Sequence, residues 1–459
     1  MEHYIFYCKL SLLAVLSLIT ACCMLSRRWY VNLAAFLACL SGETFLAHLF
    51  FPGYMLCPAA ASFIILFLSR IWDLSRTPAK GNGADPIRLP VRSGIRESRL
   101  EFYYHYSNFL VYGGAGSGKT KSIGKWLLSE YMRLGFAGFI YDFKDTDYTR
   151  TAYNLIKRHR YPHKFYYVSF DRPERSYRFN PLKVVRDRTE LIQLMEDVLL
   201  ALLPKKEQQN EWVAGGLGIL RGVAFRFWDE FPEHCTLPHI LAFIMTASAR
   251  QLSLFLQQNL VSEMLAGAYL KAEGSEKTQA SYLSTLCNNL ATISQNEEIA
   301  YVLSGDDFDF NLIDPETPKL FAVSNNFSKN SVYAPVISML MTISARQFSM
   351  QNRVPFVYFL DEMTTVNIKN FETLPSVLRE YKAAFILLTQ SGAKLENLYG
   401  KLDRSSVEAN FGNMFLGRTK DVEALKYYPL FFGKEEKERR SRSSGKSGAS
   451  SSSSVTVSS

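Results

Sequence analysis

One eight-residue loop constrains the fold of this chain more than any other part of its sequence. Residues 113–120 read GGAGSGKT, which fits the phosphate-binding pattern GxxxxGK[ST]. An apolar run at 108–112, typical of a strand, precedes the loop, and residues 121–134 follow it with apolar positions at helical spacing. In such a strand-loop-helix unit, backbone N–H groups converge on phosphate oxygens at the helix N-terminus. A chance match in a glycine-rich turn would lack this context, so the loop predicts a nucleoside triphosphate site.

Each residue of the loop has an expected role. Lys119 would reach the β- and γ-phosphates as a point charge, and the Thr120 hydroxyl would ligate Mg²⁺. The other residues would surround the phosphates with their backbone: Gly113, Gly114, Ala115, Gly116, Ser117 and Gly118.

A second chemical signature lies much later in the chain. Residues 356–362 read FVYFLDE, an apolar strand that ends in two acids. Asp361 would hold the Mg²⁺ shell, and Glu362 would orient or deprotonate the attacking water. Without the phosphate loop, the same pattern would be typical of a buried strand capped by surface acids. Together with the loop, it predicts hydrolysis of the nucleotide.

A third polar group follows the apolar run at 383–388. This strand ends in Thr389, Gln390 and Ser391, so the Gln390 side chain would lie beside the γ-phosphate and couple nucleotide state to movement. An ordinary strand-end turn is the alternative interpretation.

Composition sets broad limits on the class of protein. With 459 residues and 47% hydrophobic content, the chain can bury a large core and divide into two or three domains. A formal charge of +9 permits a polyanionic partner or an anionic membrane surface. The seven cysteines follow no metal-ligand spacing, so we infer neither a zinc site nor a disulfide framework.

The first 72 residues differ from the rest of the chain. They contain apolar stretches at 4–25, 30–50 and 54–71, close to membrane-spanning length, which predict about three transmembrane helices. Arg27 and Arg28 separate the first two stretches, and more basic residues follow the third. By the positive-inside rule, the N-terminus lies outside and residues from about 73 onward are cytoplasmic. A cleaved signal peptide ending at Ala21, ahead of Cys22, is the alternative.

The remaining sequence predicts an α/β fold with an open, mostly parallel sheet. A polar linker is expected at 73–104, followed by the first part of a nucleotide-binding domain at 105–184. Helical spacing predicts an all-α insertion at 185–305, and strand patterns return in a second part at 306–432. Residues 433–459 form a serine-rich tail whose composition predicts disorder.

Together these motifs resemble the TraG/TraD family of type IV secretion coupling proteins, which are conjugative DNA-transfer ATPases, and in particular the mobilisation-associated members of Bacteroides-type bacteria. The resemblance covers about residues 100–430. It rests on GGAGSGKTKS at 113–122, YDFKDTD at 141–147, FNPL at 179–182, FLDEM at 359–363, LREYKAAFILLTQS at 378–391, and LENLYG followed by Asn410.

The resemblance implies a RecA-like nucleotide-binding domain that uses ATP and Mg²⁺, anchored in the bacterial inner membrane with its ATPase domain in the cytoplasm. It implies a homo-hexamer whose insertion engages a relaxase and its single-stranded DNA for delivery to the secretion channel. An arginine finger from a neighbouring subunit is also implied, with Arg379 and Arg404 as candidates. Two other functions stay open: a docking receptor in which nucleotide only gates assembly, and an FtsK-like chromosomal DNA translocase.

Two departures from the family pattern stand out. Relatives continue past the position of Phe432 with further strands, whereas this chain passes into a basic run at 434–442 and the serine-rich tail. We therefore expect a truncated C-terminus that leaves a sheet edge exposed. The third apolar stretch is the other departure, because many relatives have two.

Overall fold

The computed structural model describes residues 85–458, apart from 94–95, 145, 204–206, 421, 430–438 and 448–449. The three predicted membrane-spanning stretches lie outside these residues. Within the part of the chain that is described, no helix is both long and apolar enough to cross a membrane.

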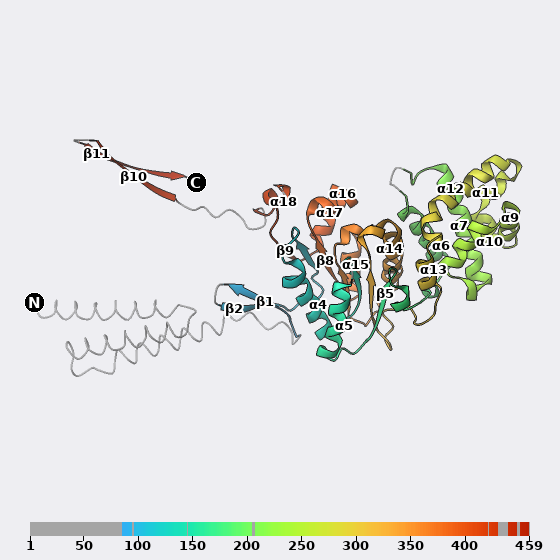
Figure 1. Ribbon diagram of the computed structural model, residues 1–459, viewed down its shortest axis with the longest axis horizontal. Helices are drawn as coiled ribbons and strands as arrows, with labels where there is room; N and C mark the ends of the chain where they lie inside the picture. Colours follow the sequence, from blue (N-terminus) through green and yellow to red (C-terminus); the bar gives the residue numbers. More distant parts are fainter. Residues whose placement is uncertain are drawn as a thin grey trace, which may run out of the picture. The chain divides into compact units, whose positions relative to one another are not determined.

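A seven-stranded sheet forms the centre of the described chain (Figure 1), and every pair of neighbouring strands in it is parallel. The strand order is β5-β6-β4-β7-β8-β3-β9, so β5 and β9 form the two edges. This arrangement confirms the predicted α/β fold with a mostly parallel sheet. The strands are β3 (Phe109–Tyr112), β4 (Ala137–Asp142), β5 (Lys164–Ser169), β6 (Lys319–Ser324), β7 (Phe356–Leu360), β8 (Ala383–Thr389) and β9 (Asn413–Leu416).

Helices cover both faces of the sheet. On one face, α4 (Lys125–Arg133) and α5 (Asp147–His159) form a buried apolar cluster with alternate strand residues such as Ile140 and Phe359. The other alternate residues, such as Phe139 and Tyr358, form a second cluster with the helices of the opposite face. Because both faces are covered, the central strands read as continuous apolar runs. The opposite face carries α14 (Asn330–Arg346), α15 (Leu374–Glu380), α16 (Gly392–Tyr399) and α17 (Lys401–Ala409).

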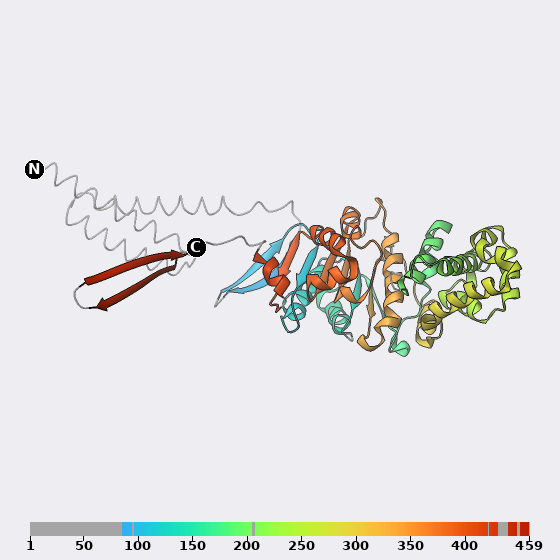
Figure 2. The ribbon, with the colours of Figure 1, turned by 90° about the horizontal axis from the view of Figure 1, so that it is seen from above.

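The segment between β5 and β6 contains helices and no strand among its described residues, as the spacing of its apolar residues predicts. Figure 2 shows these helices gathered beyond α14, apart from the strands. Their cores are apolar, with Leu191, Leu220 and Leu290 each almost inaccessible to solvent. The helices are α6 (Arg188–Ala201), α7 (Glu211–Glu230), α8 (Leu237–Thr246), α9 (Ala249–Gln257), α10 (Leu260–Leu265), α11 (Gly267–Lys271), α12 (Glu276–Ser294) and α13 (Glu297–Leu303).

Part of the expected linker at 73–104 is folded. Strands β1 (Ile87–Ser93) and β2 (Arg96–Phe102) pair as an antiparallel hairpin. Ile87 and Leu89 are buried in the same apolar cluster as α4, and the Glu130 carboxylate accepts a hydrogen bond from the Arg88 backbone N–H at 2.8 Å. The many charged residues of the hairpin obscured its alternating apolar positions, so the sequence suggested a connector.

The end of the chain also differs from expectation. The short strand β9 was not predicted, because four residues carry too little periodicity to separate a strand from a loop. In the serine-rich tail, where we expected no fold, β10 (Arg439–Ser447) pairs with β11 (Ser450–Ser458) as an antiparallel hairpin. Val455, Thr456 and Val457 supply the β-branched residues that favour a strand there. Helix α18 (Val422–Tyr427) lies between β9 and the tail.

Candidate nucleotide site

The predicted motifs meet at the carboxyl edge of the sheet. Strand β8 lies between β3, which leads into the phosphate loop, and β7, which ends at the two acids. The Gly113 backbone N–H donates to the Thr389 carbonyl at 3.3 Å, so the loop begins beside the end of β8 and close to Gln390. This edge is where open parallel sheets bind their ligands. The fold therefore brings Lys119, Asp361 and Glu362 to one place.

The phosphate loop has the backbone that its glycines permit. Gly116 and Gly118 have φ angles of 73° and 87°, a left-handed region that side chains disfavour. A Cβ atom on Gly113 would come within 2.5 Å of the Ser117 hydroxyl oxygen. The Lys119 ammonium donates to the Gly113 carbonyl, so it lies inside the loop and links the last turn of the loop to its first residue. The helix then begins at Lys119 with a π-helical turn, Lys119–Gly124, and continues as α4.

The two acids after β7 are buried without a full set of partners. Asp361 is inaccessible to solvent, and neither of its carboxylate oxygens has a hydrogen-bond partner among the described residues. Glu362 Oε2, Ser117 Oγ and Thr389 Oγ1 are likewise buried and unpartnered. Burial of an unpaired carboxylate is unfavourable unless a cation or a donor completes the site. This concentration of unsatisfied oxygens at one edge points to a ligand that supplies positive charge and donors.

Two further lysines, which the sequence motifs do not identify as site residues, lie beside the acids and the loop. Lys144, which follows β4, donates to the Thr120 hydroxyl at 3.5 Å. Lys394, in the first turn of α16, lies 3.4 Å from Glu362 Oε1. Burial lowers the pKa of Lys119, and the positive charges of Lys144 and Lys394 lower it further, although the charge of Glu362 opposes them. The site therefore holds three ammonium groups around two carboxylates, which favours a polyanionic ligand.

The predicted Mg²⁺ ligands fit a hard cation. Thr120 and Asp361 supply a hydroxyl and a carboxylate, the oxygen donors that Mg²⁺ prefers. Lys144 already places a positive charge near both, because it donates to Thr120 and its charge lowers the pKa of Asp361. Among the described residues, no cluster of three or more His, Cys, Asp or Glu side chains could hold a metal alone. A cation would therefore need nucleotide phosphates or water as further ligands, which is usual for Mg²⁺.

The environment of Asp361 leads to a prediction about stability. Burial raises the pKa of this carboxyl from 3.8 to about 7, against the charge of Lys144. The folded state thus holds the proton more tightly than the unfolded chain, and this group makes the free energy of unfolding fall as pH rises from about 4 to 7. We expect Asp361→Asn to stabilise the metal-free protein above that range by on the order of 2 kcal/mol.

Thermal unfolding with a chelator and without nucleotide, measured at about pH 4 and about pH 8, checks this prediction. The melting temperature of Asp361→Asn should exceed that of the wild type at the higher pH, and the difference should shrink at the lower pH. A variant that melts at or below the wild-type temperature at the higher pH would contradict it.

The two arginine-finger candidates have different surroundings. Arg404 donates to Glu396 at 2.8 Å and to Glu408 at 3.0 Å, within its own chain. Glu408 in turn accepts a hydrogen bond at 2.6 Å from the Tyr112 hydroxyl, at the end of the strand that leads into the phosphate loop. Arg379 is exposed in the last turn of α15, close to the amino end of β8. It therefore lies at the amino-terminal end of the strands, opposite the end that carries the phosphate loop. In this structure Arg404 supports the loop strand of the same chain.

Other residues of the sequence motifs have structural roles. Asn410 donates from its side chain to the Glu372 carbonyl at 2.8 Å. The Asn410 carbonyl accepts from the Asn108 side chain at 2.9 Å, and Asn108 Oδ1 accepts from the Phe385 backbone at 2.8 Å. Asn108 itself has a φ angle of 54°. These contacts fix the start of the loop strand against β8 and against the segment that precedes β9.

The motifs at 141–147 and 179–182 also hold the backbone. Asp142 Oδ2 accepts hydrogen bonds from both the backbone and the hydroxyl of Thr149, which anchors the start of α5. Asn180 caps the Leu182 backbone N–H at 3.1 Å and donates to the Cys235 carbonyl at 2.8 Å. The contact with Cys235 ties the sheet-containing part to the helical insertion.

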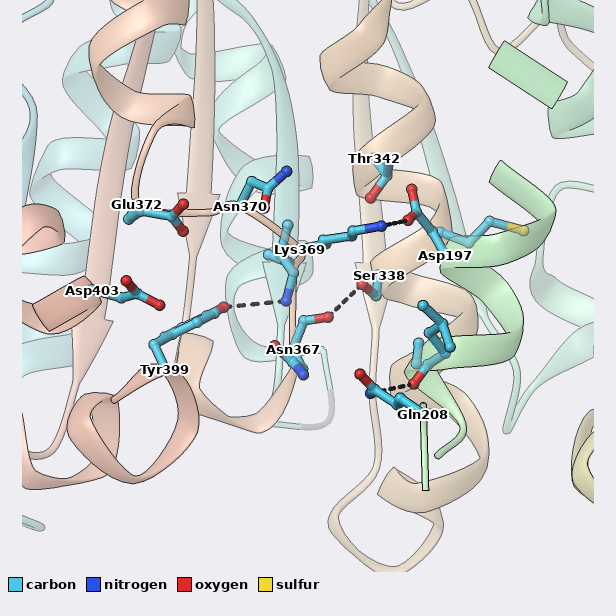
Figure 3. Close-up of a pocket in the computed structure, with 14 residues that line it drawn as sticks. Asp197, Gln208, Ser338, Thr342, Asn367, Lys369, Asn370, Glu372, Tyr399 and Asp403 are labelled. Atoms are coloured by element: carbon cyan, nitrogen blue, oxygen red, sulfur yellow. Dashed lines mark hydrogen bonds and ion pairs between the residues drawn. The ribbon is translucent and has the colours of Figure 1, made fainter. Parts of the chain in front are cut away.

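The segment that follows Glu362 leads away from the site to a cavity of about 210 Å³, drawn in Figure 3. Ile368 donates its backbone N–H to the Tyr399 hydroxyl at 3.2 Å. The Ser338 hydroxyl of α14 donates to the Asn367 carbonyl at 2.6 Å. The segment is therefore held by α14 on one side and by α16 on the other.

Lys369 connects this segment to the insertion. We call the ion pairs of Lys369, Asp197 and Arg346, with the neighbouring pair of Glu196 and Arg221, the Lys369 joint. Figure 3 shows the Lys369 ammonium directed at Asp197 of α6, and the distance between them is 3.0 Å. Asp197 is also paired with Arg346 of α14 at 2.7 Å. The neighbouring Glu196 pairs with Arg221 of α7 at 2.6 Å. The joint thus links the chain that starts at Glu362 to two helices of the insertion.

The sequence matches a known family over most of its length. A family model described as the type IV secretion-system coupling protein DNA-binding domain matches residues 100–459. That span includes the phosphate loop, both acids and the helical insertion. No curated protein was found to be similar in sequence.

Solved structures with a similar fold include those of a bacterial conjugative coupling protein, TrwB. Its unbound monoclinic form, TrwBdeltaN70, has a TM-score of 0.55 and 16% identity, and the match covers 77% of this chain and 78% of that chain. The complex of TrwB with ADP and Mg²⁺ has a TM-score of 0.54 and 17% identity, with 72% and 79% covered. The complex with the ATP analogue ADPNP gives the same values. At these identities, the likeness shows a shared fold.

Proposed function

We propose that this chain, which belongs to the family of type IV secretion-system coupling proteins, is an ATPase that drives DNA transfer during conjugation. One observation carries the proposal. Both carboxylate oxygens of Asp361 and the Oε2 atom of Glu362 are buried and unpartnered, and they lie at the same sheet edge as the phosphate loop, among three lysines. Mg²⁺ and its water ligands would supply the positive charge and donors that these oxygens lack, and the triphosphate would pair with the three lysines.

Each residue of the site then has a defined task. The loop backbone at 113–118 would bind the β-phosphate, Lys119 would leave the Gly113 carbonyl to bind the β- and γ-phosphates, and Glu362 would accept a proton from the attacking water. Bound Mg²⁺, held by Thr120 and Asp361, would neutralise developing phosphate charge. Gln390 would follow the state of the γ-phosphate from its position after β8. ADP and Mg²⁺ in the TrwB complex support this choice of ligands.

The partners follow from the family and from the sequence. We propose a homo-hexamer anchored in the inner membrane by the apolar stretches within residues 1–72, with the described residues in the cytoplasm. Its insertion would engage a relaxase and the attached single-stranded DNA for delivery to the secretion channel. Support comes from the family description, which names a DNA-binding domain. A net charge of +9 also suits a nucleic-acid partner.

The Lys369 joint would couple the nucleotide site to the insertion. A shift of Glu362 as nucleotide binds would move the segment that ends at Lys369, and with it the ion pair to Asp197. Asp197 is almost fully buried while Lys369 is half exposed. A partly buried pair of this kind supplies a coupling energy of about 1 kcal/mol, or roughly fivefold in a rate or affinity.

We therefore expect Lys369→Ala to separate the two activities of the protein. ATP turnover without DNA should stay within about twofold of the wild type, because Lys369 does not touch the nucleotide site. Stimulation of turnover by single-stranded DNA should fall about fivefold. Steady-state ATPase assays with and without DNA measure both quantities.

Lys157→Ala is the matched control, because Lys157 is an exposed lysine on α5, on the opposite face of the sheet. It should leave both rates unchanged. Equal DNA stimulation in Lys369→Ala and the control would show that the joint carries no coupling.

Transfer of a mobilisable plasmid between cells tests the proposed function as a whole. Cells with Lys119→Ala or Glu362→Gln in place of the wild-type chain should give no transconjugants above the deletion background. Normal transfer by either variant would contradict a transfer ATPase. Retention of a relaxase in pull-downs, with unchanged transfer by Glu362→Gln, would instead indicate a docking receptor.

A further inference from the structure

Lys394 is an exposed cation that reaches a buried acid. It lies in the first turn of α16, four residues after Gln390, and its side chain is 44% exposed. Its ammonium lies 3.4 Å from Glu362 Oε1, whereas the Glu362 side chain is only 3% exposed. The other carboxylate oxygen, Oε2, is buried without a partner. Lys394 thus provides the ion pair that the structure gives to the candidate catalytic acid.

This ion pair is loose and easily exchanged. Strong charge-assisted hydrogen bonds between an ammonium and a carboxylate are about 2.7–2.9 Å long, and the Lys394 pair is longer than this range. Lysine is also a compact charge on a flexible four-carbon stem, so its ammonium can move by several ångström without backbone change. Lys394 can therefore leave Glu362 when a stronger anion arrives.

Glu362 is held in an unusual conformation. Its φ angle is 46°, in the left-handed region that is uncommon for a residue other than glycine, asparagine or aspartate. Strained residues of this kind concentrate at functional sites, where the surrounding structure holds them in place. In this conformation the Glu362 side chain is buried and its carboxylate faces Lys394.

Lys394 belongs to the same charged site as the phosphate-loop lysine. Burial lowers the pKa of Lys119, and the charges of Lys144 and Lys394 lower it further. The geometric support comes from Glu362: the Lys394 ammonium lies 3.4 Å from this acid, which would have to lie beside the γ-phosphate to activate the attacking water. A γ-phosphate carries more negative charge than one carboxylate and would compete for this cation.

We propose that Lys394 is a latch that pairs with Glu362 in the nucleotide-free protein and moves to the γ-phosphate oxygens when ATP binds. This proposal rests on the proposed ATPase function. With the latch moved, both oxygens of Glu362 are available to the attacking water. The water oxygen bonds to the γ-phosphorus, the bond from that phosphorus to the β–γ bridging oxygen breaks, and ADP leaves. The water proton passes to Glu362 and then to solvent, giving phosphate as the second product.

The latch predicts an effect that depends on the γ-phosphate. In Lys394→Met, affinity for a non-hydrolysable ATP analogue should fall about tenfold relative to ADP, because only the analogue carries the γ-phosphate. The turnover number should fall about 30-fold, since a transition-state cation is lost. Lys394→Arg, which keeps the charge, should restore most of both quantities.

The experiment uses the full chain in detergent, with fluorescent ADP and a fluorescent ATP analogue for binding and phosphate release for turnover. Lys401→Met is the matched control, because Lys401 is an exposed lysine at the start of α17 and should behave as the wild type. Thermal melts confirm that each variant is folded, and Lys394→Gln serves as the second variant.

An analogue-to-ADP affinity ratio within twofold of the wild type in both Lys394→Met and Lys394→Gln would overturn the latch. A selective loss of analogue affinity that Lys394→Arg restores would support it. Absence of turnover by the wild-type chain would overturn the ATPase proposal instead, and the two binding affinities would still decide the latch.

Discussion

Lys119→Ala is expected to reduce ATP turnover by at least about 10³-fold. In the structure, the Lys119 ammonium is buried and donates to the Gly113 carbonyl, so it lies inside the loop that surrounds the phosphates. Burial lowers its pKa, yet the charge of Glu362 opposes this shift and helps the ammonium to keep its proton. No other cation of the site comes from the loop itself, so neither Lys144 nor Lys394 can replace it at the β-phosphate.

Phosphate release by the detergent-solubilised chain measures this loss. Lys119→Arg should also lose most of the turnover, because a planar guanidinium does not fit a loop closed around a compact ammonium. Lys157→Ala, outside the site, should turn over ATP at the wild-type rate. Retention of more than a tenth of the turnover by Lys119→Ala would mean that phosphate binding does not depend on this loop.

Glu362→Gln is expected to separate binding from hydrolysis. Glutamine has nearly the same shape, so the strained backbone at φ 46° and the fold around it should persist. The amide cannot accept the proton of the attacking water, and we expect turnover to fall about 10²–10³-fold. ATP affinity should stay equal or increase, since Lys394 no longer pairs with a charged acid and is available to the γ-phosphate.

Single-turnover mixing of the variant with radiolabelled ATP, followed by rapid filtration, checks both parts of this result. Unhydrolysed ATP should remain bound to Glu362→Gln. The wild type should hydrolyse its bound ATP and release ADP. Glu380→Gln, an exposed acid at the end of α15, is the control. Wild-type hydrolysis by Glu362→Gln would assign the proton transfer to a different group.

The reactive centre could be predicted where its chemistry demands particular residues at particular spacing. A phosphate loop needs glycines and a lysine before a helix, and an acid pair must follow a buried strand. Both patterns are local in the sequence, so the sequence alone singles out Lys119, Thr120, Asp361 and Glu362 as candidates, and the structure places them at one sheet edge. The strand order itself is not local, and only the structure shows β8 between β3 and β7.

The remaining charges of the site could not be predicted for the same reason. Lys144 follows β4 within the motif at 141–147, and Lys394 lies in the first turn of α16, so both are far in sequence from the phosphate loop and from the two acids. The signal that could have found them is that each follows a predicted strand, on the side where parallel sheets bind ligands. Arg404 is the reverse: the sequence made it a candidate arginine finger, whereas the structure pairs it with Glu396 and Glu408 of its own chain.

The fold was predictable where apolar periodicity was long. The helical insertion and the central strands carry such periodicity, and the structure shows both. The β1–β2 hairpin and β9 were missed, because charged residues mask the pattern of the first and the second is only four residues long. Strand β9 contributes to the site, since it pairs with the loop strand and the Gly114 N–H donates to the Arg418 carbonyl that follows β9.

We propose above all that this chain turns over ATP in a way that responds to DNA. The most direct test measures phosphate release by the full chain in detergent, with and without single-stranded DNA, using Lys119→Ala as the blank. We predict turnover that the Lys119→Ala substitution removes and that DNA increases about fivefold through the Lys369 joint. Turnover no greater than the blank, with and without DNA, would contradict the account.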